Sequence, residues 1–210
     1  MARAVKRSDT NFICKRADFQ ECMVPSVCGD FKCYLVQRGA TVYHGTGCTV
    51  KGPQILARPN FFANEPTAKS YAERRRQATG CGKVHRFTFK KPVLLLRMDL
   101  CSNVRKLTAL ARKYRRKKVL ESFNLAFNCT GAEREQKRPL RYSKNSEVDT
   151  TVARFVTQLG FAGFATKKQR LVCSKTLERI KKRGKTVGPE CYFHAEMYLR
   201  EPEEVLMYKK

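Results

Sequence analysis

The chain has 210 residues, enough for one domain with a sizeable buried core. Its 44 lysines and arginines against 18 aspartates and glutamates give a formal net charge of +26, which predicts a polyanionic partner, above all nucleic acid held through its phosphates. No apolar run approaches the ~18 residues of a membrane span, and the N-terminus has no apolar segment typical of a secretory signal. We therefore expect an intracellular or virion-associated protein.

In chain order, residues 1–30 show no clean hydrophobic period and predict a basic N-terminal arm or loose cap. The domain itself is expected over residues 31–210. Residues 31–36 and 41–44 are strand candidates, and the second ends at a glycine-bearing turn.

A helix is predicted to begin at Glu65, because Asn64 can cap it and Pro66 suits its first turn. Glycines 80 and 82 end this helix. The alternation over residues 83–89 predicts a strand, and the apolar run 93–98 predicts a more buried one.

From residue 103 the pattern becomes helical, and basic residues separate the apolar ones. We expect one basic helix over residues 105–118, within an insertion near 103–148 that continues as an exposed loop over 131–148. The apolar stripe of this helix comprises Val104, Leu107, Leu110, Ala111 and Tyr114.

A capping-box pattern at residues 146–149 predicts a further helix, ended at Gly160. A short strand over residues 161–165, a basic excursion over 179–185 and a last strand near 192–199 complete the chain. Strands and helices interleave without regular alternation, which favours an α+β fold.

The ten cysteines contain no Cys-x-x-Cys pair. The spacing of Cys22, Cys28 and Cys33 is irregular for zinc, and Cys81 with His85 is a lone pair, so no metal site is predicted. The even number leaves disulfides open. The cysteines beside apolar residues are expected to be small core residues; they include Cys101, Cys129 and Cys173.

Three stretches carry residues that packing does not require. The first is Tyr43-His44-Gly45-Thr46 at a strand end; the second is Phe61-Phe62-Ala63, followed by a helix that carries Tyr71. The third is the last strand, with Glu196 among apolar neighbours. Taken singly, each has an ordinary explanation: a turn histidine, core aromatics, a carboxylate facing water. Their order and spacing together carry the functional signal.

Together these stretches resemble the split NAD-binding core of the ADP-ribosyltransferase superfamily, in the His-Tyr-Glu arrangement of its poly-ADP-ribose-polymerase branch. The resemblance covers roughly residues 40–210, and the segment 159–164 is similar to members from large DNA viruses. It implies an ADP-ribosyltransferase-like split mixed β-sheet with flanking helices, and NAD as the substrate.

The resemblance also implies residue roles. His44 would contact a ribose hydroxyl, the backbone of Gly45 would pair with the nicotinamide amide, and Phe61 and Tyr71 would sandwich the nicotinamide ring. Phe61 stands where the family usually has tyrosine, so this position offers no hydroxyl. Glu196 would hold the ribose 2′-hydroxyl and stabilise positive charge as nicotinamide leaves.

His194 lies two residues before Glu196, on the same face of a strand, and is expected to be a cofactor-binding residue as well. In the family, this position often helps to select the acceptor. His85 is interpreted as structural. The basic clusters predict contacts with nucleic acid, either as one continuous phosphate-tracking face or as separate solvated surfaces. The predicted contacts are Arg74, Arg75, Arg76, Arg112, Lys113, Arg115, Arg116, Lys117 and Lys118.

Two functions remain open from the sequence. One is transfer of ADP-ribose from NAD to a protein or nucleic-acid acceptor. The alternative is a non-catalytic basic structural protein that binds nucleic acid, such as a minor capsid or virion core component of a large DNA virus. NAD binding separates them, because only the enzyme requires it.

Overall fold

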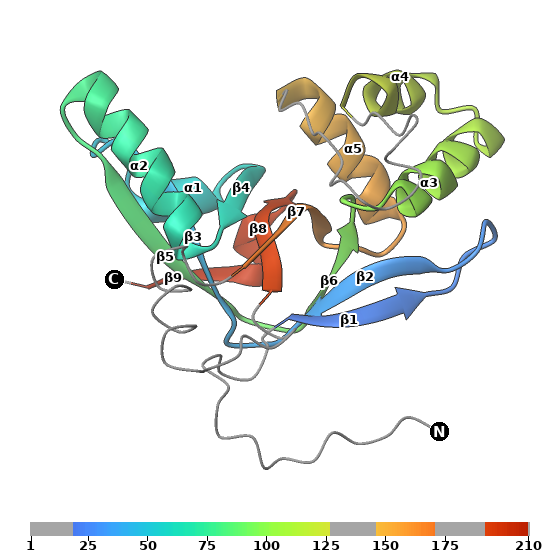
Figure 1. Ribbon diagram of the computed structural model, residues 1–210, viewed down its shortest axis with the longest axis horizontal. Coiled ribbons are helices and arrows are strands. Elements are labelled where there is room, and N and C mark those ends of the chain that lie inside the picture. Colours follow the sequence, from blue (N-terminus) through green and yellow to red (C-terminus); the bar gives the residue numbers. More distant parts are fainter. Residues whose placement is uncertain (1–18, 127–145, 171–191, 210) are drawn as a thin grey trace, which may run out of the picture.

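The computed structural model describes residues 19–126, 146–170 and 192–209 (Figure 1). These residues form an α+β fold with one mixed nine-stranded sheet and six helices. No helix in these ranges is long and apolar enough to cross a membrane.

The sheet has the strand order β1-β2-β6-β7-β8-β4-β3-β5-β9. Only β6 and β7 pair in parallel; the other neighbours among the described strands are antiparallel. β3 and β4 pair at a single position, Tyr43 with Ala63, so the sheet is weakly joined near its middle. The strands are β1 (Phe19–Val24), β2 (Phe31–Val36), β3 (Thr41–Thr46), β4 (Asn60–Ala63), β5 (Lys83–Phe89), β6 (Val93–Arg97), β7 (Gly163–Arg170), β8 (Tyr192–Leu199) and β9 (Leu206–Lys209).

The helices gather at two ends of the molecule. Figure 1 places α3, α4 and α5 together near one end of the long axis and α2 near the other. The helices are α1 (Gly52–Leu56), α2 (Glu65–Thr79), α3 (Cys101–Lys113), α4 (Lys117–Ala126), α5 (Ser146–Gln158) and α7 (Pro202–Val205).

Alternating side chains of the strands enter two hydrophobic clusters on opposite faces of the sheet. On β6, for example, Leu96 joins the cluster beneath α3, α4 and α5, whereas Leu95 joins the other. On β8, Tyr198 and Met197 divide in the same way. Successive side chains of a strand therefore reach opposite faces of the sheet.

The predicted boundaries of α2 are confirmed. The Asn64 side chain accepts a hydrogen bond from the backbone N–H of Thr67 at 2.9 Å, and Gly80 closes the helix in the left-handed conformation, with φ of 78°. The predicted strands at 31–36, 41–44 and 83–89 are also present. Cys101 is buried as expected, while Cys129 and Cys173 lie outside the described residues.

Three expectations differ from the structure. Residues 19–24, expected in the N-terminal arm, form β1 and pair with β2. The basic stretch 105–118 is not one helix, because α3 ends at Lys113 and α4 begins at Lys117. Tyr114 therefore leaves the apolar stripe, and it is 51% exposed.

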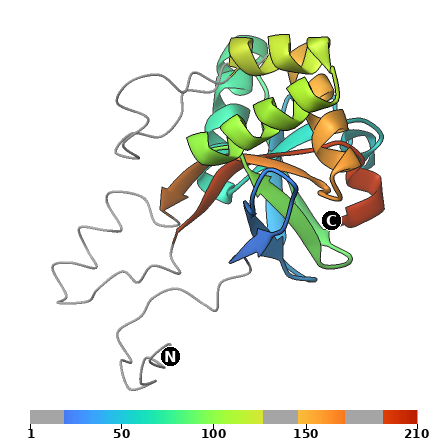
Figure 2. The same ribbon diagram turned by 90° about the vertical axis from the view of Figure 1, so that its right-hand side faces the viewer.

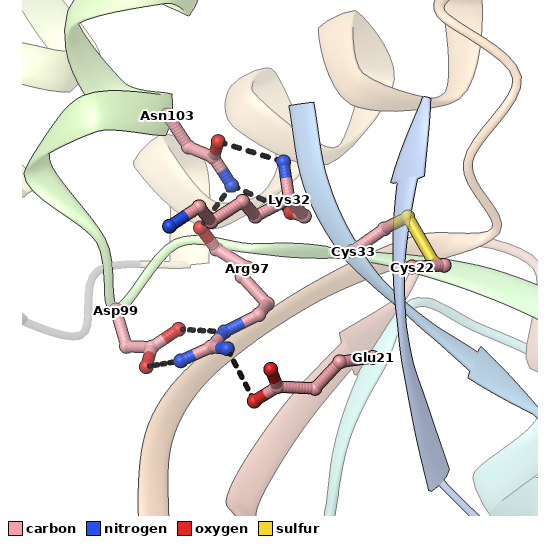
Figure 3. Close-up of polar contacts among 7 residues, drawn as sticks. All are labelled: Glu21, Cys22, Lys32, Cys33, Arg97, Asp99 and Asn103. Atoms are coloured by element: carbon pink, nitrogen blue, oxygen red, sulfur yellow. Dashed lines mark hydrogen bonds and ion pairs between the residues drawn. A yellow bond between two sulfur atoms is a disulfide. The ribbon is translucent and has the colours of Figure 1, made fainter. Parts of the chain in front are cut away.

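A partly buried polar cluster joins β1, β2, β6 and α3 (Figure 3). The guanidinium of Arg97 donates to Asp99 at 3.0 Å and to Glu21 at 2.7 Å, and it lies 4.9 Å from the Tyr34 ring centre. Burial alone would lower the pKa of Arg97, but the hydrogen bond and charge of Asp99 outweigh it and raise that pKa. Burial also raises the pKa of the Tyr34 hydroxyl.

Three further contacts support this cluster. The amide nitrogen of Asn103 in α3 donates to the backbone carbonyls of Lys32 at 2.6 Å and Arg97 at 2.8 Å. A disulfide between Cys22 and Cys33 links β1 to β2 across the same region (Figure 3). Edge strand β1 is thus fixed by a covalent bond and an ion pair as well as by its backbone ladder.

Candidate functional site

A cleft of about 680 Å³ is lined by β3, the loop after it, β4, α2 and β8. It brings together five of the residues that the sequence selects: His44, Gly45, Phe61, Tyr71 and Glu196. The cleft lies where β3 and β4 are weakly joined. Because β8 pairs with β4, residue 196 sits opposite Ala63, at the same end of the sheet as His44.

Glu196 is the carboxylate of this cleft. It is partly buried on β8, and the Tyr71 hydroxyl donates a hydrogen bond to its Oε1 from helix α2. The two residues are 125 positions apart in the chain. A hydrogen bond to a carboxylate is stronger than one between neutral groups, so Tyr71 fixes the orientation of Glu196.

His44 connects the two weakly paired strands. Its Nδ1 lies 2.5 Å from the backbone carbonyl oxygen of Phe61 on β4. A carbonyl oxygen can only accept, so Nδ1 carries the proton, and in the neutral imidazole Nε2 carries the lone pair. The ring also lies 5.8 Å from that of Phe62, centre to centre. His44 therefore has a structural role at this site, and its Nε2 is the nitrogen with acceptor capacity.

Gly45 lies where α2 crosses β3. A Cβ built on Gly45 would be 2.1 Å from the carbonyl oxygen of Ala68 and 2.8 Å from the backbone nitrogen of Ala72. A glycine is therefore required here by helix packing alone, whatever approaches the strand from the cleft.

Phe61 contributes both to the cleft and to the core. Its ring contacts that of Tyr198 edge-on, with 4.8 Å between centres, and it packs against the cluster beneath α3, α4 and α5. The Tyr71 ring is covered by the guanidinium of Arg74, 4.8 Å from its centre. Both aromatic residues of the predicted stacking pair are thus present at the cleft, each with a partner of its own.

The three consecutive arginines of α2 diverge, because successive helix residues point 100° apart. Arg74 covers Tyr71, Arg75 lines the cleft, and Arg76 pairs with Glu73 at 2.7 Å. The three guanidinium groups therefore have three different surroundings. Helix α2 also lies toward the opposite end of the long axis from α3 and α4 (Figure 1), so the two predicted basic segments are not neighbours in the fold.

Sequence reasoning missed three residues of the cleft. Arg58 lies in the loop before β4 and lines the cleft as Arg75 does, but nothing in its local sequence marks it. Cys48 and Cys81 also line the cleft and form a disulfide that joins the loop after β3 to the loop between α2 and β5. Cysteine spacing alone leaves this pairing undetermined.

His85 is buried, as expected for a structural residue. Its Nε2 lies 3.1 Å from the Thr46 hydroxyl, and its Nδ1 has no hydrogen-bond partner within the described chain. Burial, with a smaller effect from the Lys83 charge, lowers the pKa of His85. No group of three or more potential metal ligands comes together in residues 19–126, 146–170 and 192–209.

His194 lies in β8 opposite Lys168 of β7, but its side chain is outside the described part of the structure. The basic segment 179–185 also lies outside it. The remaining predicted nucleic-acid contacts are all exposed where α3 passes into α4: Arg112, Lys113, Arg115, Arg116, Lys117 and Lys118.

Comparisons with known proteins identify no relative: no family model, curated protein or solved structure matches this chain.

Proposed function

We propose that this protein transfers ADP-ribose from NAD to a protein or nucleic-acid acceptor in the cleft between β3, β4 and β8. One observation carries the proposal. The three stretches that resemble the ADP-ribosyltransferase superfamily are far apart in sequence, yet His44, Tyr71 and Glu196 line one cleft. Convergence of this kind is what an NAD site of that family requires, and packing alone does not demand it.

The chemistry available to Glu196 fits this reaction. Its carboxylate, held by Tyr71, is suited to accept a hydrogen bond from the ribose 2′-hydroxyl of NAD and to stabilise positive charge developing at C1′. The bond from C1′ to nicotinamide breaks, and its electron pair neutralises the pyridinium ring. The acceptor's lone pair then forms the new bond to C1′, and its proton passes to Glu196 or water.

The aromatic residues are compatible with the flat nicotinamide ring. Phe61 lacks the hydroxyl usual at its position in the family, but stacking needs only the ring face. The hydroxyl of Tyr71 instead contacts the carboxylate directly. Glu196 therefore has a tyrosine partner even though residue 61 carries no hydroxyl.

Charge supports a dinucleotide substrate. Arg58 and Arg75 line the same cleft as Glu196, and guanidinium groups match the geometry and charge of phosphates. The cleft volume of about 680 Å³ falls within the usual range for sites that enclose a ligand.

The second candidate is the non-catalytic basic structural protein. The exposed basic residues around the α3–α4 turn favour it, because they do not line the cleft and need no NAD to explain them. In this case the cleft would be a scaffold feature without turnover.

The test is release of nicotinamide and incorporation of labelled ADP-ribose by the purified protein, with and without nucleic acid. Glu196→Gln should lower turnover by at least about 100-fold, because the neutral amide cannot stabilise the transition-state charge. Glu204→Gln on α7 is the matched control and should keep wild-type turnover. No turnover in the wild type, with nucleic-acid binding intact, would replace this proposal with the structural one.

A further inference from the structure

A dense basic segment joins α3 to α4, and we call residues 112–118 the basic turn. All seven residues are exposed; six are lysine or arginine and the seventh is Tyr114. Within the described chain, none of the six cations pairs with an acidic side chain. Figure 2 looks onto this end of the molecule and shows α3 and α4 crossing it in front.

Fold stability does not explain this arrangement. Arg112 and Lys113 suit the C-terminal end of α3, where the helix dipole favours cations, but Lys117 and Lys118 occupy the first turn of α4, where it opposes them. Six like charges in such a short segment also repel one another. An anionic partner would relieve both effects.

The exposed tyrosine adds information about that partner. Helical spacing would bury Tyr114 with the stripe of α3, but the helix ends at residue 113 and the ring is 51% exposed. Its ring contacts no other aromatic side chain among the described residues. An exposed aromatic ring surrounded by cations is the combination that binds unstacked bases together with their phosphates.

The backbone of the turn is also strained. Arg115 has φ of 50°, and it is the one residue other than glycine with positive φ in the described ranges. Glycine adopts this conformation with less strain, so an arginine here is disfavoured by local structure. The charge at this position therefore needs a reason other than the turn itself.

We propose that the basic turn binds single-stranded nucleic acid, with Tyr114 stacked on a base and the flanking arginines on phosphates. A duplex is a poorer fit, because its bases are already stacked and offer no free face to the ring. The turn carries no large apolar side chain other than Tyr114, so an anionic lipid surface is also less favoured. This inference does not depend on the activity of the cleft.

The experiment measures fluorescence anisotropy of labelled probes with the full chain over a range of salt concentrations. The probes are oligothymidylate, oligouridylate and a mixed-sequence duplex, each about 20 units long, because one single-strand site covers about 4–16 nucleotides. We expect either or both single strands to bind more tightly than the duplex. Tyr114→Ala should weaken single-strand binding about 5- to 100-fold, and Tyr114→Phe should restore it.

Charge removal gives a separate readout. Arg115→Gln/Arg116→Gln should weaken binding and reduce the slope of log affinity against log salt by about 1.4, since each phosphate that is no longer neutralised accounts for about 0.7. Arg86→Gln/Lys209→Gln removes the same charge from exposed sites on β5 and β9 and should leave the slope unchanged. Circular dichroism of each variant confirms that it is folded.

Three results would overturn the proposal. The first is tighter binding of duplex than of either single strand. The second is no effect of Tyr114→Ala on single-strand affinity in a folded variant. The third is equal loss of affinity in the β5/β9 control. Binding to phosphatidylserine vesicles that exceeds nucleic-acid binding, and that disappears when Arg115 and Arg116 are replaced, would also overturn it.

Discussion

At the scale of single residues, the contact between Tyr71 and Glu196 is the most informative feature of the cleft. A helix residue and a strand residue that are 125 positions apart in the chain meet there. If the cleft binds NAD, we expect Tyr71 to be a positioning residue, because it would act on the substrate through the carboxylate that it holds.

Tyr71→Phe keeps the ring and removes the hydroxyl, so it separates these two roles. If the cleft cleaves NAD, we expect kcat to fall about 10- to 100-fold, which corresponds to one hydrogen bond to a charged group, with little change in KM. Steady-state nicotinamide release measures both constants. Tyr208→Phe is the control, since Tyr208 packs beside Phe87 outside the cleft. A rise in KM alone would instead mean that the Tyr71 hydroxyl contributes to binding of the substrate rather than to the orientation of Glu196.

His85 predicts how stability responds to acid. Burial lowers its pKa in the folded protein, so the unfolded chain takes up a proton first as pH falls. Its contribution to stability is complete above the unfolded pKa of about 6.5 and decreases as pH falls from there toward the lower folded pKa. Urea unfolding between about pH 7 and pH 5 should show this loss, and His85→Gln should reduce it. An unchanged pH dependence in the variant would exclude His85 as its source.

At the scale of secondary-structure elements, β1 depends on the Arg97 cluster. The Arg97 and Asp99 side chains are 9% and 7% exposed, whereas the Glu21 side chain is 62% exposed. The two ion pairs of the Arg97 guanidinium therefore differ in burial. Loss of Arg97 removes the buried pair with Asp99 and leaves that carboxylate in its buried position.

We expect Arg97→Ala to lower the free energy of unfolding by about 3–5 kcal/mol. Glu21→Gln, which removes the exposed partner only, should cost less than about 1 kcal/mol. Urea unfolding of the two variants with intact disulfides measures the difference. Similar losses in both would mean that burial does not distinguish the two ion pairs.

Elements with local signals could be predicted from the sequence. The start of α2 is encoded by Asn64 and its end by Gly80, and both act within a few residues. Strand β1 could not be predicted from the sequence, because its position depends on pairing with β2, on the Cys22–Cys33 bond and on Arg97. The break between α3 and α4 was also hidden, since neither glycine nor proline marks it and an arginine takes the left-handed position.

At the scale of the whole molecule, the cleft could be predicted only in part. His44, Phe61, Tyr71 and Glu196 were selected through the resemblance to a family, and the strand order brings them together. The contacts between them follow from tertiary packing, which no local pattern encodes. The same holds for Arg58. Nothing in the local sequence distinguishes this exposed loop arginine, and it becomes a cleft residue only through the tertiary placement of β3 and α2.

The net charge of +26 predicts how the fold responds to salt. Like charges repel at the distances found within a domain, and this repulsion opposes the compact state. Salt screens interactions beyond a Debye length of about 8 Å near 0.15 M, so added sodium chloride should stabilise the protein. We expect Tm to rise by about 2–4 °C between about 10 mM and about 150 mM salt, which corresponds to about 1 kcal/mol for a domain of this size. Calorimetry measures this shift, and sucrose at equal osmolality is the control because it adds no ions.

A Tm that falls with salt would mean that attractive ion pairs such as Arg97–Asp99 outweigh the overall repulsion. A rise that disappears once a saturating oligonucleotide is bound would mean that the partner neutralises the same charges.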